Sequence, residues 1–149
     1  MDISEVLQPG LMLFDLKAKD KREAIEELAG PMLEEGYLTD GDAYVRAVME
    51  RETVYSTGIG MGVGIPHGKS AAVTQPVVAF GRSKQGVEFQ AMDGKPVYLA
   101  FLIAVPENSD NEHLNILSML SRSLMHEEVR NALLNAATPG EVLDAFGNI

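Results

Sequence analysis

The stretch VYLAFLIAV, residues 97–105, decides the fold of this chain. Nearly every position in it is apolar, whereas a strand with one solvent-facing side alternates apolar and polar residues. A continuous apolar run of strand length has both faces covered, so it predicts the central strand of a sheet with helices above and below. Asp93-Gly94 marks a turn before this strand, and Pro106 ends it.

The rest of the chain supplies the other elements of such a sheet. Further strands are predicted at 11–16, 77–80 and 87–90. Apolar spacing and capping residues predict helices at 20–36, kinked or divided at Pro31, and at 39–51, 109–124, 127–136 and 138–146. Residues 1–149 show no linker or repeat and are expected to form a single domain. The predicted class is α/β, a three-layer α/β/α sandwich with a central mixed, largely parallel sheet flanked by helices.

Composition narrows the function classes. The chain has 22 acidic and 12 basic residues, a formal net charge of −10, and no Lys/Arg cluster, so no nucleic acid ligand is expected. The acidic surface either favours a basic partner protein or only keeps the chain soluble. Because there are no cysteines and only three histidines, no metal and no cofactor are expected. No apolar run is long enough for direct membrane insertion and no leader pattern is present, so a cytoplasmic location is expected.

The most informative motif is GIGMGVGIPHG, residues 58–68. In an extended segment its glycines would leave one face almost bare, so that something could approach closely. Pro66 restricts the direction in which the chain reaches His67, and Gly68 permits a sharp turn after it. We expect His67 to act as a nucleophile, although a lone histidine in such a segment is more commonly a hydrogen-bonded loop residue.

This stretch matches neither of two nucleotide-binding motifs that it resembles. A dinucleotide fingerprint needs glycine where Val63 or Ile65 stands. A phosphate-binding loop ending at Gly68-Lys69-Ser70 would need glycine at Val63, and Pro66 lacks the N–H that such a loop uses.

Two distant residues complete a candidate site. His113 falls in the first turn of a predicted helix, near unpaired N–H groups that attract phosphate. Arg51, at the end of another helix, offers a planar fork of donors that matches phosphoryl oxygens. Each also has a simpler interpretation: His113 as a solvated residue at a helix start, Arg51 as a cation that neutralises a helix terminus. Together with His67 they suit metal-independent handling of a phosphoryl group.

At these residues the chain resembles the fructose/mannitol-type enzyme IIA domains (type 2) of the bacterial sugar phosphotransferase system. The resemblance covers nearly the whole chain, and its most specific part comprises Glu52, Ile59-Gly60 and the run Val63 to Gly68, with Gly64 where alanine is usual. Arg51-Glu52, the segment 87–106 and Asn111 to Leu114 also match.

The resemblance implies a phosphotransferase with a phosphohistidine intermediate. His67 would accept a phosphoryl group, through Nε2, from the histidine-containing phosphocarrier protein and donate it to a cysteine of an enzyme IIB domain, for sugar transport. His113 and Arg51 would bind the phosphoryl oxygens. The nitrogen-type IIA proteins, which regulate other proteins, are the main alternative, and a small hydrolase is a distant third. A monomer or weak dimer is expected.

Overall fold

The sheet is built around the strand that the sequence places at its centre. The computed structural model describes residues 3–109 and 111–147, without the side chains of residues 112 and 113. Strand β6 (Val97–Pro106) pairs antiparallel with β5 and parallel with β3 and β4. From Val97 to Val105 every residue except Tyr98 is buried. The central position predicted from the apolar run is therefore confirmed.

The elements follow one another along the chain in an α/β order. The strands are β1 (Leu7–Leu13), β2 (Gly58–Gly60), β3 (Val63–Gly64), β4 (His67–Ser70) and β5 (Val77–Val87), besides β6. The helices are a 3₁₀ turn (Ile3–Glu5), α1 (Lys21–Glu34), α2 (Gly41–Glu52), α3 (Glu112–Leu124), α4 (Glu127–Asn135) and α5 (Pro139–Gly147). The sheet order is β1-β5-β6-β3-β2, with β4 also paired to β6.

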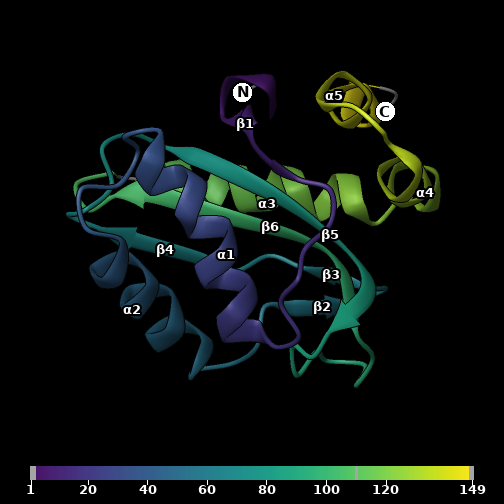
Figure 1. Ribbon diagram of the computed structural model, residues 1–149, viewed down its shortest axis with the longest axis horizontal. Coiled ribbons are helices and arrows are strands. Elements are labelled where there is room, and N and C mark those ends of the chain that lie inside the picture. Colours follow the sequence, from purple (N-terminus) through teal and green to yellow (C-terminus); the bar gives the residue numbers. More distant parts are fainter. Residues whose placement is uncertain (1–2, 110, 148–149) are drawn as a thin grey trace.

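Helices cover both faces of this sheet, as Figure 1 shows. One apolar cluster joins alternate strand residues to α1 and α2, and a second joins the intervening strand residues to α3, α4 and α5. Three strand pairs are parallel and two are antiparallel. The predicted three-layer sandwich with a mixed, largely parallel sheet is confirmed. Within the described ranges, none of the helices is both long and apolar enough to cross a membrane.

The starts of α1 and α2 follow the capping chemistry of the sequence. Asp20 caps α1 by accepting from the Glu23 N–H at 2.9 Å, and Asp40 caps α2 in the same way. Pro31 lies inside α1 without dividing it, although it removes one helical hydrogen bond. Its neighbour Met32 and the preceding Leu28 are fully buried, so packing keeps the helix continuous.

Two strand predictions are wrong in their limits. β1 begins at Leu7 rather than Leu11, and it tolerates Pro9 because it is an edge strand, where a missing N–H need not break a ladder. The strand predicted at 77–80 continues to Val87 as one strand, β5, whose pairing to β6 shifts between Arg82 and Val87. Only the first residue of the strand predicted at 87–90 belongs to it. Gly86, at φ +91°, accommodates that irregularity.

Candidate functional site

The glycine-rich segment folds into a hairpin followed by an edge strand. Strands β2 and β3 pair antiparallel, and the last residue of β2, Gly60, and the two residues after it, Met61 and Gly62, all have positive φ. The Met61 N–H donates to the Asp93 carboxylate at 3.2 Å, which ties the hairpin tip to the loop before β6. The expectation of one extended segment is therefore wrong, because three left-handed residues in succession reverse the chain.

Residues 63–70 then run beside β6 with a single interruption. Each paired residue of β3 and β4 lies opposite the residue 36 positions later, so the register is the same before and after Pro66. Pro66 has no N–H to give to a ladder, but its carbonyl oxygen still accepts from the Ile103 N–H at 3.0 Å. The Ile65 N–H instead donates to the Thr57 carbonyl oxygen at 3.0 Å. His67 is thus the first residue of β4 and not the last residue before a turn.

The bare face of the glycines is filled by the chain itself. A Cβ on Gly64 would lie 3.2 Å from Phe89, and a Cβ on Gly68 would lie 2.7 Å from Val48 of α2. Gly68 is therefore needed for close packing of α2 on β4, and the sharp turn expected after His67 is absent from the described backbone. Gly64 leaves the space that Phe89 occupies.

His67 is held in one orientation by its own backbone. Its partner in the ladder, Ile103, belongs to the apolar cluster under α3, so the imidazole leaves the sheet on that face. Nδ1 lies 3.0 Å from the Ile65 carbonyl oxygen. Because a carbonyl can only accept, Nδ1 carries the proton of the neutral ring, and Nε2 keeps the lone pair. The residue is 9% exposed.

The surroundings of His67 favour the neutral ring. Burial lowers its pKa below the usual value of 6.5, because the charged form would lose hydration, and the nearby Arg51 guanidinium lowers it further. The Ile65 carbonyl oxygen and the Glu52 carboxylate oppose this effect. A neutral imidazole is the form that can use its lone pair as a nucleophile.

Arg51 lies in the last turn of α2 and is partly exposed. Its guanidinium stacks on the Tyr55 ring, 4.1 Å from the centroid, and Nη1 donates to the Tyr55 carbonyl oxygen at 3.3 Å. A guanidinium has five N–H donors, and within the described part of the chain only this one bond is formed. The charge therefore stands near His67 with donors to spare.

His113 is placed only by its backbone. It lies in the first turn of α3, on the face of the sheet toward which His67 points, whereas its side chain lies outside what the structure describes. The helix predicted at 109–124 is wrong in its start: α3 begins at Glu112 after Asn111, which forms no side-chain cap. Ser109 is buried in the preceding turn, where its N–H donates to the Pro106 carbonyl oxygen.

A buried ion pair under the site was not identified from the sequence. Lys21 Nζ lies 3.0 Å from Glu52 Oε1, and the two side chains are 9% and 2% exposed. Glu52 also accepts from the Thr57 N–H at 3.1 Å and from the Thr57 hydroxyl at 2.6 Å. A signal was available, because Lys21 shares a helix face with Ala24, Ile25 and Leu28, all of them buried.

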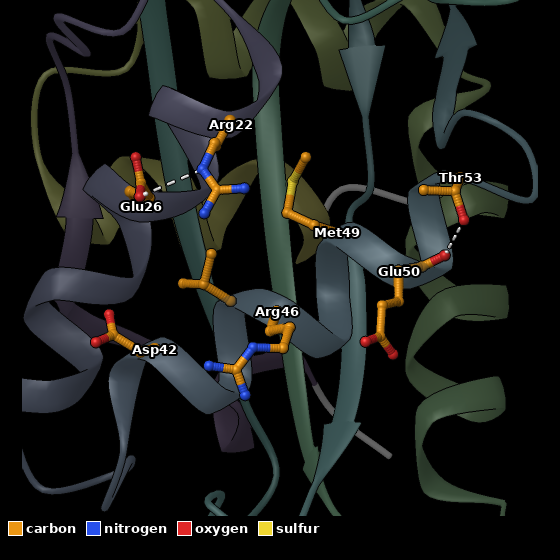
Figure 2. A pocket seen from close by; sticks show the side chains of 8 residues that line it. Arg22, Glu26, Asp42, Arg46, Met49, Glu50 and Thr53 are labelled. Atoms are coloured by element: carbon orange, nitrogen blue, oxygen red, sulfur yellow. Dashed lines mark hydrogen bonds and ion pairs between the residues drawn. The ribbon is translucent and has the colours of Figure 1, made fainter.

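A separate groove between α1 and α2, with a volume of about 460 Å³, holds none of these site residues. Figure 2 shows its rim of opposite charges, where Arg22 faces Glu26 and Arg46 lies between the acidic side chains of Asp42 and Glu50. Across the described side chains, no three histidine or acidic groups gather as metal ligands would.

The chain is similar to known proteins along nearly its whole length. Residues 5–148 match the family described as phosphoenolpyruvate-dependent sugar phosphotransferase system, EIIA 2. The chain is 45% identical over 148 residues to the fructose-specific EIIA component of Haloferax volcanii, covering 99% of this chain and 96% of that protein. It is 42% identical over 144 residues to the fructose-specific EIIABC component of Bacillus subtilis, covering 97% of this chain but only 23% of that protein. The crystal structure of nitrogen regulatory protein IIA-Ntr from Neisseria meningitidis superposes with a TM-score of 0.86 at 36% identity, covering 95% and 97% of the two chains.

Proposed function

The chain belongs to the EIIA 2 family of the sugar phosphotransferase system, and we propose that His67 is the residue on which it carries a phosphoryl group. The observation that supports this most directly is the hydrogen bond from Nδ1 to the Ile65 carbonyl oxygen. It fixes the tautomer in which Nε2 is the nucleophile. The work of the protein is then to position the ring and to supply fixed positive charge.

The proposed donor is the phosphohistidine of the histidine-containing phosphocarrier protein. The Nε2 lone pair of His67 forms a bond to phosphorus while the bond between phosphorus and the donor nitrogen breaks, and the donor leaves as a neutral imidazole. The proton on Nδ1 stays in place throughout, and the Ile65 carbonyl oxygen stabilises the positive charge that the ring gains. Because no proton has to move and the donor is already activated, the step needs no metal.

The proposed acceptor is a cysteine thiolate of an enzyme IIB domain. A phosphorus–sulfur bond forms there as the bond to Nε2 breaks, and His67 regains its lone pair. The Bacillus subtilis relative is named as an EIIABC component, so its name joins an A part with B and C parts. This name supports a IIB partner for the present chain. We propose a fructose- or mannitol-like sugar as the final acceptor and a cytoplasmic site of action.

Arg51 and His113 are proposed to bind the phosphoryl oxygens. Arg51 supplies N–H donors in a planar fork beside His67, which would stabilise charge on the equatorial oxygens of the transition state. For His113 the support is the placement of its backbone in the first turn of α3, whose N–H groups favour an anion.

The test is phosphorylation by the phosphorylated carrier protein. Wild type is expected to take up one phosphoryl group per chain, and His67→Ala none. His126→Ala is the matched control, because that histidine is 50% exposed and pairs with Glu128. Equal labelling of the wild type and His67→Ala, or loss of labelling in His126→Ala, would refute the assignment.

A second function, regulation of other proteins, is favoured by the similarity to IIA-Ntr from Neisseria meningitidis. In that case phosphorylation at the same histidine would add charge at a recognition surface and change which proteins bind. Transfer from the phosphorylated chain to a cognate IIB domain distinguishes the two. Rapid transfer supports the transport role, whereas a phosphorylated chain that no IIB domain discharges supports regulation.

A further inference from the structure

Lys21 is a charged residue placed where a hydrocarbon would be expected. It is the first residue of α1, it is 7% exposed, and it lies on the face that packs against the sheet. Its ammonium group contacts Glu52 at 3.0 Å and the Gln90 side-chain oxygen at 3.3 Å, and it lies 5.4 Å from the Phe89 ring centroid. All these partners come from segments distant in sequence.

Glu52 links this lysine to the glycine-rich hairpin. Oε1 accepts from Lys21 and from the Thr57 N–H, and Oε2 accepts from the Thr57 hydroxyl at the short distance of 2.6 Å. Thr57 is itself buried and immediately precedes β2. One carboxylate therefore fixes the N–H and the hydroxyl of the residue that opens the hairpin.

From Thr57 the hydrogen bonds continue to the imidazole. The Thr57 carbonyl oxygen accepts from the Ile65 N–H at 3.0 Å, and the Ile65 carbonyl oxygen accepts from His67 Nδ1 at 3.0 Å. An unbroken chain of contacts thus runs from the Lys21 ammonium to the His67 ring, and each link fixes the orientation of a peptide group or side chain in the next.

We propose that Lys21 is a positioning residue for phosphoryl transfer, which acts through Glu52 and Thr57 to hold the Ile65 carbonyl against His67 Nδ1. This proposal rests on the function proposed for His67. Lys21 touches neither the imidazole nor the transferred group. Its effect is on the tautomer and orientation of the ring, and thereby on the availability of Nε2.

The competing interpretation is that Lys21 only neutralises Glu52 so that the chain can fold. Energetics argue against stability as the sole purpose, because a buried ion pair commonly stabilises a fold no more than a well-packed apolar pair does. In this chain the pair also joins the start of α1 to the end of α2 and, through Thr57, to the start of the hairpin. The two interpretations differ in what happens to the His67 tautomer when the protein stays folded.

The experiment measures the His67 tautomer directly in the unphosphorylated protein, by the ¹⁵N chemical shifts of its ring nitrogens. Lys21→Met removes the charge and keeps the stem, Lys21→Arg keeps the charge, and Arg22→Met is the control. Arg22 is the next residue of α1 but pairs with Glu26 at the exposed groove of Figure 2. Urea unfolding of each variant identifies the conditions under which it is folded.

Under folding conditions, Lys21→Met is expected to increase the population of the tautomer protonated at Nε2 and to slow phosphoryl uptake by about 10²-fold, the effect of a small misplacement of a reacting group. Lys21→Arg is expected to recover most of the tautomer preference, and Arg22→Met to match wild type in both measurements. A folded Lys21→Met protein with the tautomer and uptake rate of wild type would overturn the proposal.

A milder variant keeps the proposal testable if Lys21→Met does not fold. Thr57→Val removes only the hydroxyl that donates to Glu52 and leaves the ion pair intact. A shift of its tautomer in the same direction supports the proposal, and an unshifted tautomer contradicts it. Because the tautomer is read without phosphorylation, this result is independent of whether His67 carries a phosphoryl group, which the His67→Ala labelling decides.

Discussion

Lys21 and Arg51, the two cations that we propose to serve His67, differ in how firmly they are held. Lys21 is 7% exposed, pairs with Glu52 and is bonded to the Gln90 side chain, so its position is fixed by two segments distant from it in sequence. Arg51 is partly exposed, stacks on Tyr55 and forms one hydrogen bond of 3.3 Å. Although Arg51 and Glu52 are neighbours in α2, they take part in these two different arrangements.

This difference matches two different tasks, orienting the imidazole and binding a phosphoryl oxygen. A group that orients the imidazole must not move, and burial together with an ion pair and a hydrogen bond restricts its motion. A group that binds a phosphoryl oxygen must exchange its resting partner for the oxygen, and a weakly held guanidinium can do so at small cost. To test this division, each cation is removed in turn, and the free energy of unfolding and the rate of phosphoryl transfer are measured separately.

The largest expected effect is on stability. Lys21→Met leaves the Glu52 carboxylate buried without its cation, so the free energy of unfolding should fall by about 3–5 kcal/mol. Arg22→Met, which removes an exposed pair, should change it by less than about 0.5 kcal/mol. Urea unfolding monitored by circular dichroism measures both, and equal values for the two variants would show that burial does not distinguish these cations.

Arg51→Ala should leave the stability nearly unchanged and mainly slow phosphoryl transfer. The free energy of unfolding should stay within about 0.5 kcal/mol of wild type, because the side chain is partly exposed and weakly bonded. Phosphoryl uptake by His67 should slow by about 10²–10³-fold, since a donor to the transition-state charge is lost. Rapid-quench measurement of uptake from the phosphorylated carrier protein gives the rate. Arg51→Lys, which keeps the charge without the fork, should fall between the two; an unchanged rate in Arg51→Ala would leave Arg51 as a helix-terminal cation.

A smaller effect is expected from Tyr55. Tyr55→Leu removes the ring on which the guanidinium stacks, and a cation–π contact at an exposed site contributes about 0.5–1 kcal/mol. The rate of uptake should therefore change by roughly two- to fivefold, since about 1.4 kcal/mol corresponds to a factor of ten. Tyr37→Leu serves as the control, because Tyr37 packs against the cluster under α1 and α2. A change as large as that of Arg51→Ala would mean that Tyr55 has a second role.

Arg51 and Glu52 shift the pKa of His67 in opposite directions, so a pH titration distinguishes them. Burial and Arg51 lower the pKa of His67, whereas the Ile65 carbonyl and Glu52 raise it. In an NMR titration, Arg51→Ala should therefore move the midpoint upward and Glu52→Gln downward. In wild type, uptake should be insensitive to this group above pH 6.5 and should fall as the pH drops through the lowered pKa. A shift in the same direction in both variants would contradict the arrangement of charges described here.

The lowered pKa of His67 also makes the stability of the fold depend on pH. Because the folded protein binds a proton on His67 less readily than the unfolded chain, this residue contributes stability that is fully present above pH 6.5. The contribution is lost as the pH falls through the folded pKa. The difference in unfolding free energy between wild type and His67→Ala should therefore narrow in acid.

Much of the fold was predictable because single residues carried unambiguous signals. The unbroken apolar run of β6 requires two covered faces, and Asp20 and Asp40 mark the starts of their helices by capping chemistry. The limits of β1 and β5 were missed because they depend on partner strands, which relax the penalty for Pro9 and absorb the irregularity at Gly86. That residues 1–149 form one domain stays a prediction.

The roles of His67, Arg51 and His113 stay predictions from the sequence, and the structure adds the geometry around them. The Arg51 charge acts on His67, while the side chain of His113 lies outside the described part. The sequence could not show that residues 60–62 reverse the chain, since Met61 is a residue type that rarely adopts positive φ. It also missed Lys21, whose burial depends on a partner 31 positions later.

The constant register of β3 and β4 along β6 has a consequence for how this segment can vary in length. Side chains along an extended strand alternate between its two faces, so the number of residues between Gly64 and His67 must keep its parity. Insertion of one residue there would turn the imidazole toward α1 and α2, whereas insertion of two would return it to its own side with a bulge. The side of the sheet on which the His67 imidazole lies is therefore set by the register of this segment against β6.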